Sequence, residues 1–526
     1  MSKRIVICSD GTGNSAIKGR GTNVFKLFEA VDLDGHRVDA AKTPQVAIYD
    51  DGVGTQTFTP LKILAGATGW GLSRNVKHLY KELSRVYDPG DEIFMFGFSR
   101  GAFTVRTLAG FIASCGLINP AKLENKTFKG LERAVDEAYS AYRKCYRPEL
   151  WKVFGEPTLD AAKEFRKRVS FDIDVTIRFL GVWDTVDAVG LPFWIGDFIN
   201  LTLYRFKFPD LKLTPIVERA CQALAIDDER ESFRPLLWEQ EAKDADRIEQ
   251  VWFAGSHSNV GGGYPKQGMS LVALDWMLAH AQRAGVHVGK DGLRLNDADR
   301  ESFRSHASVD DKLYDPRAGL GTFYRWKIRD IATLCKKHHA PVRVHLSVLE
   351  RLAHGTDDYA PGNLPGLAQV VVTDTAQTNK AQQLANAHAT ELLRLRASNT
   401  EKVLRSMAAH SLLYRVRKAM SIGRSSYYLY LAAVVGAVVD VGAMLASWWQ
   451  GGGFSPAGLV IGTGWGMVAA ALAAAFLLSL WVDNHLSNVF SGEWYRKHDD
   501  LRKALKDARI QVGTSRSDAP VVRGVA

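Results

Sequence analysis

The chain has 526 residues, of which 46% are hydrophobic and 24% are charged, and its formal net charge is +10. This length and composition exclude a disordered or low-complexity protein and allow more than one domain with a large core. The five cysteines are odd in number, widely spaced and without a C-x-x-C pair, so we expect reduced structural thiols and neither a disulfide framework nor a zinc site. No nucleic-acid-reading motif occurs, and we expect no nucleic-acid partner, no metal and no cofactor.

The first predicted strand, Lys3–Cys8, runs into a polar, glycine-rich loop. The apolar run ends too early for a signal peptide. A loop of this kind at the end of a central strand can offer backbone N–H groups to an anion. Gly11 and Thr12 are therefore candidate oxyanion donors, and Asp10 is a candidate for orienting the site. The alternative is a plain strand-to-helix connection in which Asp10 or Ser15 caps the helix.

Strands and helices then alternate along the chain. A second strand is predicted at Val46–Tyr49, a helix at Asn75–Tyr87, a third strand at Glu92–Phe96 and a further helix at Ala102–Ile112. Such alternation favours a mostly parallel sheet with helices on both faces and ligands at the carboxyl ends of the strands.

Residues 97–101 read Gly-Phe-Ser-Arg-Gly and match G-x-S-x-G between a predicted strand and a predicted helix. In that setting the pentapeptide is typical of a nucleophile elbow, a strained turn that exposes the serine hydroxyl. Gly97 and Gly101 would let neighbouring chain pass where a Cβ would clash. The N–H of Arg100, at a helix N-terminus, could stabilise an oxyanion. We predict Ser99 as a nucleophile; the alternative is an ordinary tight turn.

Two later loops supply partners for this serine. The predicted strand Val175–Val182 leads to Asp184, where the chain order Ser, Asp, His places a triad acid that would fix the histidine tautomer. Asp187 is an alternative acid, and Asp184 could instead cap the next turn. The predicted strand Ile248–Phe253 precedes a small-residue loop with His257, which suits a general base.

The intervening segments carry less specific signals. Ala121–Arg168 is charged and helical and is expected to form an insertion or cap over the sheet. Gly190–Leu213 is rich in aromatic residues, as in an apolar flap or an ordinary packed cap. Glu218–Trp238 is expected to begin as a helix and to carry the charged cluster 225–230, which could line the site or form structural ion pairs. His345 is a second histidine candidate, although its valine-flanked setting favours packing.

Several stretches in this order resemble the catalytic domain of type VI secretion phospholipase effectors, of the Tle type. They are residues 10–12, 97–102, 182–186, 252–264, 344–351 and 359–365. The resemblance covers roughly the first 366 residues. It implies an α/β-hydrolase fold and cleavage of phospholipid acyl esters, with Ser99 as nucleophile, Asp184 as acid and His257 as base. The histidine loop of that family usually reads His-x-Asp-Val-Gly-Gly, whereas Asn259 replaces the aspartate in this chain.

The C-terminal part changes character. Thr375–Arg417 is polar, alanine-rich and predicted to be a helical stalk. The apolar stretches Tyr427–Trp449 and Ala457–Val482 are each long enough to cross about 30 Å of hydrocarbon. Asp440 in the first would cost about 2.5–3.5 kcal/mol at mid-helix. Basic residues flank the pair, so the positive-inside rule predicts a two-helix inner-membrane hairpin with the catalytic domain and C-terminus cytoplasmic. The alternative is a buried helical hairpin.

The predicted domains are therefore a catalytic domain at 1–372, a stalk at 373–425, a transmembrane hairpin at 426–483 and a basic tail at 484–526. We expect a membrane-anchored serine hydrolase acting on a phospholipid or another acyl-ester lipid by an acyl-enzyme mechanism. Expected partners are the inner-membrane bilayer and, through the hairpin glycines, a second copy or a secretion-system component. The alternatives are a catalytically idle membrane scaffold or secreted cargo, and a thioesterase or other esterase on a soluble substrate.

Overall fold

The computed structural model describes residues 2–11, 21–51, 70–145, 159–186, 211–285, 289, 291–316, 327–359 and, with short gaps, 361–388. Beyond these ranges it describes only scattered residues between 422 and 507. The chain divides into two compact units, one made of residues 1–316 and 327–385 and the other of residues 317–326 and 386–526. The sheet and the candidate site belong to the first unit.

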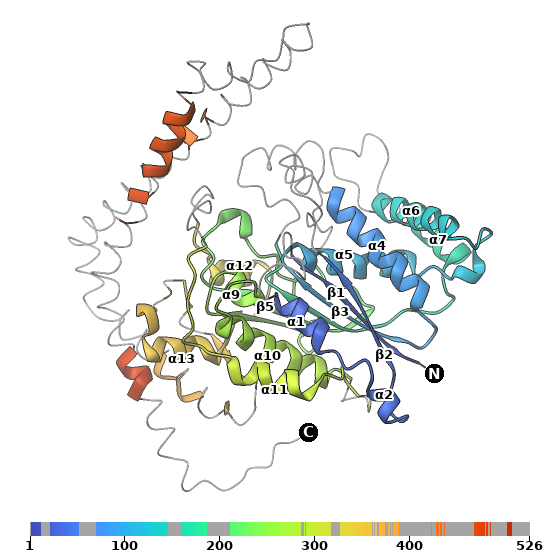
Figure 1. Ribbon diagram of the computed structural model, residues 1–526, viewed down its shortest axis with the longest axis horizontal. Helices are drawn as coiled ribbons and strands as arrows, with labels where there is room; N and C mark the ends of the chain where they lie inside the picture. Colours follow the sequence, from blue (N-terminus) through green and yellow to red (C-terminus); the bar gives the residue numbers. More distant parts are fainter. Residues whose placement is uncertain are drawn as a thin grey trace, which may run out of the picture. The chain divides into compact units, whose positions relative to one another are not determined.

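An eight-stranded sheet in the order β2-β1-β3-β4-β5-β6-β7-β8 forms the centre of the first unit (Figure 1). Every neighbouring pair of strands is parallel. The strands are β1 (Arg4–Ser9), β2 (Gln45–Asp50), β3 (Glu92–Phe98), β4 (Ile177–Trp183), β5 (Val217–Ala225), β6 (Ile248–Phe253), β7 (Arg343–His345) and β8 (Gln369–Val371). The central strands read as nearly continuous apolar runs because helices cover both faces. The predicted α/β fold with a parallel sheet is confirmed.

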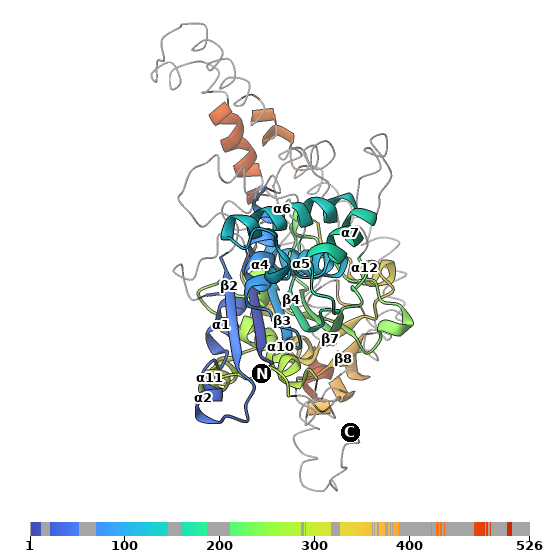
Figure 2. The ribbon, with the colours of Figure 1, turned by 90° about the vertical axis from the view of Figure 1, so that its right-hand side faces the viewer.

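Helices form a layer on each face of this sheet (Figure 2). The alternation of side chains along β1 and β3 sends Ile5 and Met95 toward one core and Val6 and Phe96 toward the other. The first core is completed by α4 (Trp70–Val86), α5 (Arg100–Cys115), α6 (Phe128–Lys144) and α7 (Asp160–Val169). The second is completed by α1 (Asn23–Ala30) and α10 (Gly268–Arg283). The remaining helices are α2 (Gly35–Val38), η1 (Pro120–Lys122), η3 (Glu231–Phe233), η4 (Ala242–Asp244), α9 (His257–Gly261), α11 (Asp297–His306), α12 (Ile331–Lys337), α13 (Leu346–His354) and η7 (Thr356–Asp358).

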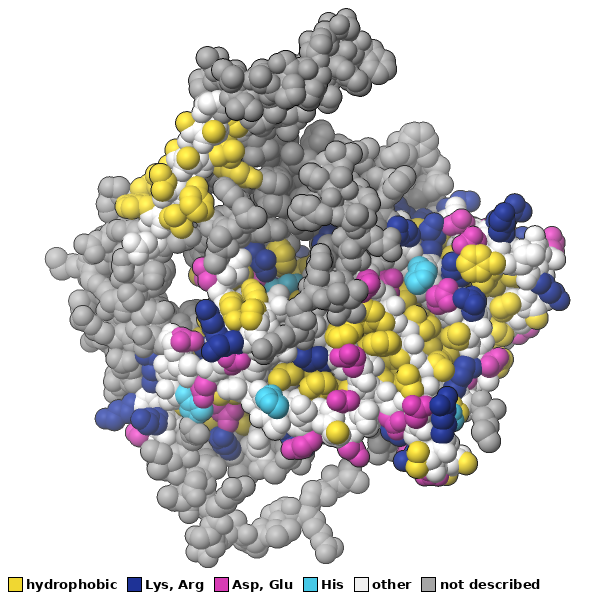
Figure 3. All heavy atoms as spheres, viewed as in Figure 1, with side chains coloured by type: hydrophobic (Ala, Val, Ile, Leu, Met, Phe, Trp, Pro, Cys, Tyr) yellow, Lys and Arg dark blue, Asp and Glu magenta, His cyan; other side chains and the backbone are white. Residues whose placement is uncertain are grey.

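The charged helices that were expected as a cap, α6 and α7, pack outside α4 and α5 as an outer layer. Ion pairs between Lys77 and Asp136 and between Lys81 and Glu132 join α4 to α6. On the visible, described part of the face in Figure 3, basic and acidic side chains are interspersed. The net positive charge therefore does not gather into one patch there.

The prediction of a helix before Ala225 is wrong, because this segment is β5, between β4 and β6. Its side chains are buried on both faces, with Ala220, Cys221 and Ala223 each 0% exposed. Its second half, from Ala220 to Ala225, is apolar apart from Gln222, and such a run without alternation suits a buried helix and a central parallel strand equally, so periodicity alone could not separate them.

The prediction of a two-pass inner-membrane protein is contradicted. Within the part of the chain that the structure describes, no helix combines the length and apolar character that a membrane span requires. Most of both apolar stretches, including Asp440, and most of the expected stalk lie outside the described residues.

Candidate active site

Ser99 occupies the sharp turn between β3 and α5, with φ 58° and ψ −121°. Few L-residues adopt such a positive φ, and residues held there cluster at functional sites. The Ser99 N–H donates to the carbonyl oxygen of Trp183 at 3.1 Å, and the Ser99 carbonyl accepts from the N–H of Phe103 at 3.3 Å. The strand, strained turn and helix predicted from G-x-S-x-G are therefore all present.

The glycines on either side of this turn have no room for a side chain. A Cβ on Gly97 would lie 2.6 Å from the carbonyl oxygen of Gly101. A Cβ on Gly101 would lie 2.1 Å from the carbonyl oxygen of Ser9 and 2.5 Å from that of Asp10. The end of β1 therefore packs directly on the elbow, and close backbone approach explains both glycines.

Asp184 and His257 form a hydrogen bond at the carboxyl end of the sheet. Asp184 follows β4, His257 begins α9 after β6, and His257 Nδ1 lies 2.6 Å from Asp184 Oδ2. The carboxylate accepts the Nδ1 proton, which leaves Nε2 as the acceptor nitrogen of the neutral ring. The Nε2 atom is buried and has no hydrogen-bond partner among the described residues.

Aromatic rings place His257 against the elbow. Phe98, the residue before Ser99, lies with its ring centroid 4.6 Å from that of His257. A Cβ on Gly261, at the end of α9, would lie 2.0 Å from the Phe98 ring. Phe233 contacts His257 edge-on with a centroid distance of 5.0 Å. The structure thus brings the elbow, His257 and Asp184 together at the ends of β3, β6 and β4.

Burial lowers the pKa of His257, although the carboxylates of Asp184 and Asp228 oppose this effect. The imidazole is therefore neutral at neutral pH and able to accept a proton. Burial alone would raise the pKa of Asp184, but the charge of Arg329 and the hydrogen bonds from His257 and Arg329 bring that pKa well below its usual range. Asp184 is fully buried and stays ionised.

Arg329 is a site residue that the sequence analysis missed. Its Nη1 lies 2.7 Å from Asp184 Oδ1 and its Nη2 lies 2.9 Å from Asp184 Oδ2. The same guanidinium donates to the carbonyl oxygens of Ala225 and Phe233, both at 2.6 Å. No motif surrounds this arginine, so only the folded chain reveals it.

Asp228, part of the charged cluster that follows β5, also reaches His257. Its Oδ2 accepts the backbone N–H of His257 at 3.1 Å. Arg230 binds both oxygens of this carboxylate, at 3.0 and 2.6 Å, and lies 3.5 Å over the ring of Phe233. The cluster therefore contacts the candidate site through Asp228 and also forms an ion pair.

The loop after β1 is held by Asp10. Its carboxylate accepts from the N–H of Gly11 at 2.6 Å, the hydroxyl of Thr22 at 2.6 Å and the hydroxyl of Tyr49 at 2.7 Å. The helix cap of α1 is Thr22 and not Asp10. Thr12, like the alternative cap Ser15 and the alternative acid Asp187, lies outside the described residues.

Asn259 fills the position where the resemblance noted in the sequence led us to expect aspartate. Its Oδ1 accepts from the N–H of Ser256 at 3.3 Å, the hydroxyl of Ser256 at 3.0 Å and the N–H of Tyr314 at 3.2 Å. Its Nδ2 donates to the carbonyl oxygen of Lys312 at 3.0 Å. The amide is 2% exposed and links α9 to residues 312–314, and an aspartate could not make the donated bond.

His345 has the packing role that its sequence setting favoured. It is the N-cap of α13, bonded to the hydroxyls of Ser347 at 2.9 Å and Thr373 at 3.1 Å. Its ring stacks on Phe253 at 4.7 Å, and burial lowers its pKa to about 3. A neutral, doubly bonded ring of this kind is a structural element.

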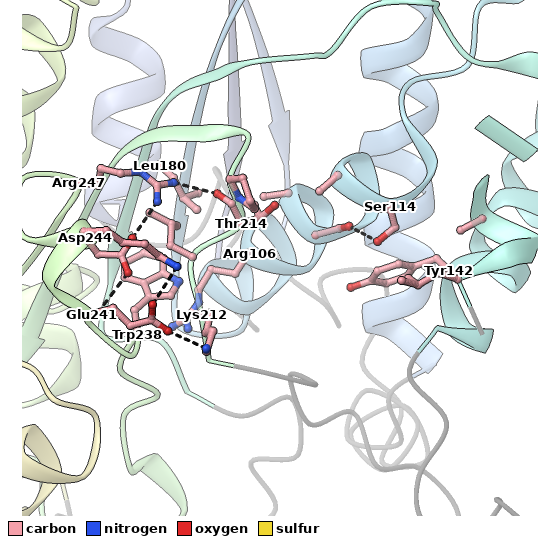
Figure 4. A pocket seen from close by; sticks show the side chains of 18 of the residues that line it. Arg106, Ser114, Tyr142, Leu180, Lys212, Thr214, Trp238, Glu241, Asp244 and Arg247 are labelled. Carbon is pink, nitrogen blue, oxygen red and sulfur yellow. Dashed lines mark hydrogen bonds and ion pairs between the residues drawn. The ribbon is translucent and has the colours of Figure 1, made fainter. Parts of the chain in front are cut away.

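A separate cavity of about 510 Å³ lies beside α5, farther along that helix from Ser99 (Figure 4). Leu180 and Trp238 contribute apolar surface, and Arg106 lies 4.3 Å over the Trp238 ring. Ion pairs of Lys212 with Glu241 at 2.7 Å and of Arg247 with Asp244 at 2.8 Å line it. The described lining includes neither Ser99, Asp184 nor His257, so this cavity is distinct from the candidate site.

The model of the family "T6SS, Phospholipase effector Tle1-like, catalytic domain" matches residues 3–280, more than half of the chain. The chain belongs to this family. The match includes the elbow, Asp184 and His257, whereas Arg329 lies beyond it.

Individual relatives are more distant. The uncharacterized protein YEL023C of Saccharomyces cerevisiae is 29% identical over 254 residues, which are 45% of this chain and 33% of the yeast protein. The chain thus spans about a third of the length of that relative. An uncharacterized protein from Pseudomonas aeruginosa is 16% identical with a TM-score of 0.32, over 74% of this chain and 59% of the other. The Tle1 effector bound to the VgrG spike of the type VI secretion system is 19% identical with a TM-score of 0.28, over 50% and 51%.

Proposed function

We propose that this chain is a serine hydrolase that cleaves acyl esters of lipids, phospholipids in particular, through Ser99, His257 and Asp184. One observation carries the proposal: a buried His257 ring is bonded to Asp184 at 2.6 Å, packs against Phe98, the residue before the elbow serine, and keeps Nε2 without a hydrogen-bond partner among the described residues. This is the arrangement in which an acid fixes the tautomer of a base for a nucleophilic hydroxyl. Membership of the phospholipase-effector family supports a lipid ester as substrate.

The proposed reaction has two halves. His257 Nε2 takes the proton of the Ser99 hydroxyl as its Oγ attacks the ester carbonyl, and the leaving alcohol then receives that proton. The N–H of Arg100, at the first position of α5, would donate to the oxyanion, because the positive end of a helix dipole stabilises negative charge there. Water then hydrolyses the acyl-enzyme by the same steps in reverse order.

The second oxyanion donor would come from the loop after β1, which packs on the elbow through Ser9 and Asp10. The sequence named Gly11 and Thr12 for this role. In the structure the Gly11 N–H donates to Asp10, so it would have to turn from the carboxylate to the substrate. Asp10 would act on this loop and not on the substrate.

The test is hydrolysis of phospholipid vesicles by purified wild type, Ser99→Ala and Ser114→Ala. Ser114 is a matched control because it lies on the same helix and, among the described residues, its hydroxyl bonds the Gly110 carbonyl, at 2.9 Å. We expect fatty-acid release by wild type and Ser114→Ala and a loss of at least about 10³-fold in Ser99→Ala. Cleavage of soluble esters or thioesters but no lipid would favour the soluble-substrate alternative. No hydrolysis of any ester would leave an idle hydrolase fold.

A further inference from the structure

We propose that Arg329 is a positioning residue of the catalytic site, which locks the carboxylate of Asp184 in line with His257 and offsets its charge. This inference rests on the proposed function and adds a fourth residue to it. Arg329 lies between residues 317–326, outside the described part, and α12, and it belongs to the same compact unit as the triad residues.

The hydrogen bonds of Asp184 explain how Arg329 fixes the orientation of its carboxylate. Oδ1 accepts from the N–H of Ala225 at 3.0 Å and from Arg329 Nη1 at 2.7 Å. Oδ2 accepts from His257 Nδ1 at 2.6 Å and from Arg329 Nη2 at 2.9 Å. These four bonds use the four lone-pair directions of a carboxylate, and a forked guanidinium fixes its plane. Without Arg329, each oxygen would keep one bond and the carboxylate could rotate.

Arg329 also connects the acid to the base by a second route. Its Nη2 donates to the carbonyl oxygen of Phe233, whose ring contacts His257 edge-on. Its Nη1 donates to the carbonyl oxygen of Ala225, the last residue of β5, whose N–H binds Asp184. One buried guanidinium therefore sets both the acid and one wall of the imidazole pocket.

The charged groups around His257 explain how Arg329 offsets the charge of Asp184. The imidazole bonds Asp184 after β4, and the backbone N–H of His257 donates to Asp228 after β5; these carboxylates are bound by Arg329 and Arg230 respectively. Asp227 lies nearby, partly buried and bonded to the N–H of Gly255 and the hydroxyl of Tyr359, and desolvation raises its pKa to about 6. Removing Arg329 would leave the negative charge of Asp184 unbalanced beside His257.

The Asp184–His257 pair would then bind a proton more readily, so the pKa of the pair would rise. His257 would therefore be protonated, and unable to act as a base, up to a higher pH than in wild type. An opposite charge in contact typically shifts a pKa by about 1–3 units, so we expect the acid limb of kcat/KM to move up by about 1 unit or more in Arg329→Gln. A merely structural role would lower the yield of folded protein and leave the acid limb of the folded fraction unchanged.

The experiment measures kcat/KM against pH for wild type, Arg329→Gln and Arg329→Lys with a soluble nitrophenyl ester, normalised to the folded fraction. Arg294→Gln and Arg294→Lys are matched controls far from the site in the fold. Arg294 likewise binds one carboxylate, Asp32 at 2.6 Å, and two main-chain carbonyls, those of Thr43 at 2.9 Å and Asp32 at 3.2 Å.

We expect Arg329→Gln to lose at least about tenfold in kcat/KM with a raised acid limb. Lysine restores the charge but not the fork, so Arg329→Lys should return the acid limb to the wild-type position and still lose kcat. The Arg294 variants should keep the wild-type limb.

The inference would be overturned if folded Arg329→Lys had the kcat of wild type. It would also be overturned if the acid limb of the kcat/KM profile in folded Arg329→Gln lay at the wild-type pH. If Arg329→Gln does not fold, the kcat of Arg329→Lys decides. Inactive wild type would overturn the proposed function itself, whereas active wild type with Arg329 variants like the Arg294 controls would overturn only the role of Arg329.

Discussion

Gly101→Ala should damage the elbow far more than a second glycine-to-alanine change on the same helix. The new Cβ would lie 2.1 Å from the carbonyl oxygen of Ser9 and 2.5 Å from that of Asp10. Both are backbone atoms at the end of β1, which is paired with β2 on one side and β3 on the other, so they cannot give way easily. Relief requires a shift of β1 or of the turn at Ser99.

The cost can be bounded from related substitutions. Overpacking a well-packed site typically costs about 1–3 kcal/mol, and this backbone clash belongs at the upper end. A loss of about 3 kcal/mol lowers the folded-to-unfolded ratio by roughly 100-fold. Displacement of the Ser99 hydroxyl by about 1 Å would also cost on the order of 100-fold in rate.

Gly110→Ala is the matched control, in the interior of α5. Its Cβ would meet only the Tyr142 hydroxyl, at 3.2 Å, and alanine is the better helix former by about 1 kcal/mol. Urea denaturation followed by tryptophan fluorescence gives the stability of both variants, and ester hydrolysis per folded molecule gives their activity. Equal stability and equal activity of the two variants would refute the close packing of β1 on the elbow.

Two further predictions concern His257 and Asn259. Because burial lowers the pKa of His257 from its usual value of about 6.5, kcat/KM should fall only at a pH below about 6.5. The same shift makes the neutral ring stabilise the folded state fully above about pH 6.5 and progressively less below it. A pH–rate profile with its acid limb above about 6.5 would contradict this prediction. Asn259→Asp should lose the bond to the Lys312 carbonyl and destabilise the fold by about 1–3 kcal/mol, without a gain in activity. The control Asn125→Asp should be neutral, because Asn125 lies at an exposed turn and its side-chain bonds to Thr127 use the Oδ1 acceptor. Denaturation curves of both variants test this prediction, and a more active Asn259→Asp would oppose it.

The elbow could be predicted from the sequence because its determinants are local. The strand, the Gly-x-Ser-x-Gly turn and the helix lie within residues 92–115, and the steric demand on Gly97 comes from the turn itself, whereas that on Gly101 comes from the end of β1. Asp184 and His257 could be named as candidates because each follows a recognisable strand in a fixed chain order. In these cases a short stretch of sequence carried the whole signal.

Arg329 could not be found in this way because its partner is distant in sequence. It lies 145 residues from Asp184, and what identifies it is the carboxylate it binds, not its neighbours in the chain. The same reason explains β5, because only its pairing with the flanking strands β4 and β6 identifies this segment as a strand. Asp228 was visible as part of a charged cluster, but only the fold shows that its carboxylate receives the His257 N–H.

Labelling with a fluorophosphonate probe tests the central claim most directly, because the reaction requires a serine activated by its base. The measurement compares wild type, Ser99→Ala, His257→Ala and the control Ser114→Ala, with the modified peptide located by mass spectrometry. The account predicts labelling of wild type and Ser114→Ala on Ser99, none on Ser99→Ala, and a rate reduced at least about 100-fold in His257→Ala. Folded wild type that is not labelled, or is labelled at a serine other than Ser99, would contradict it.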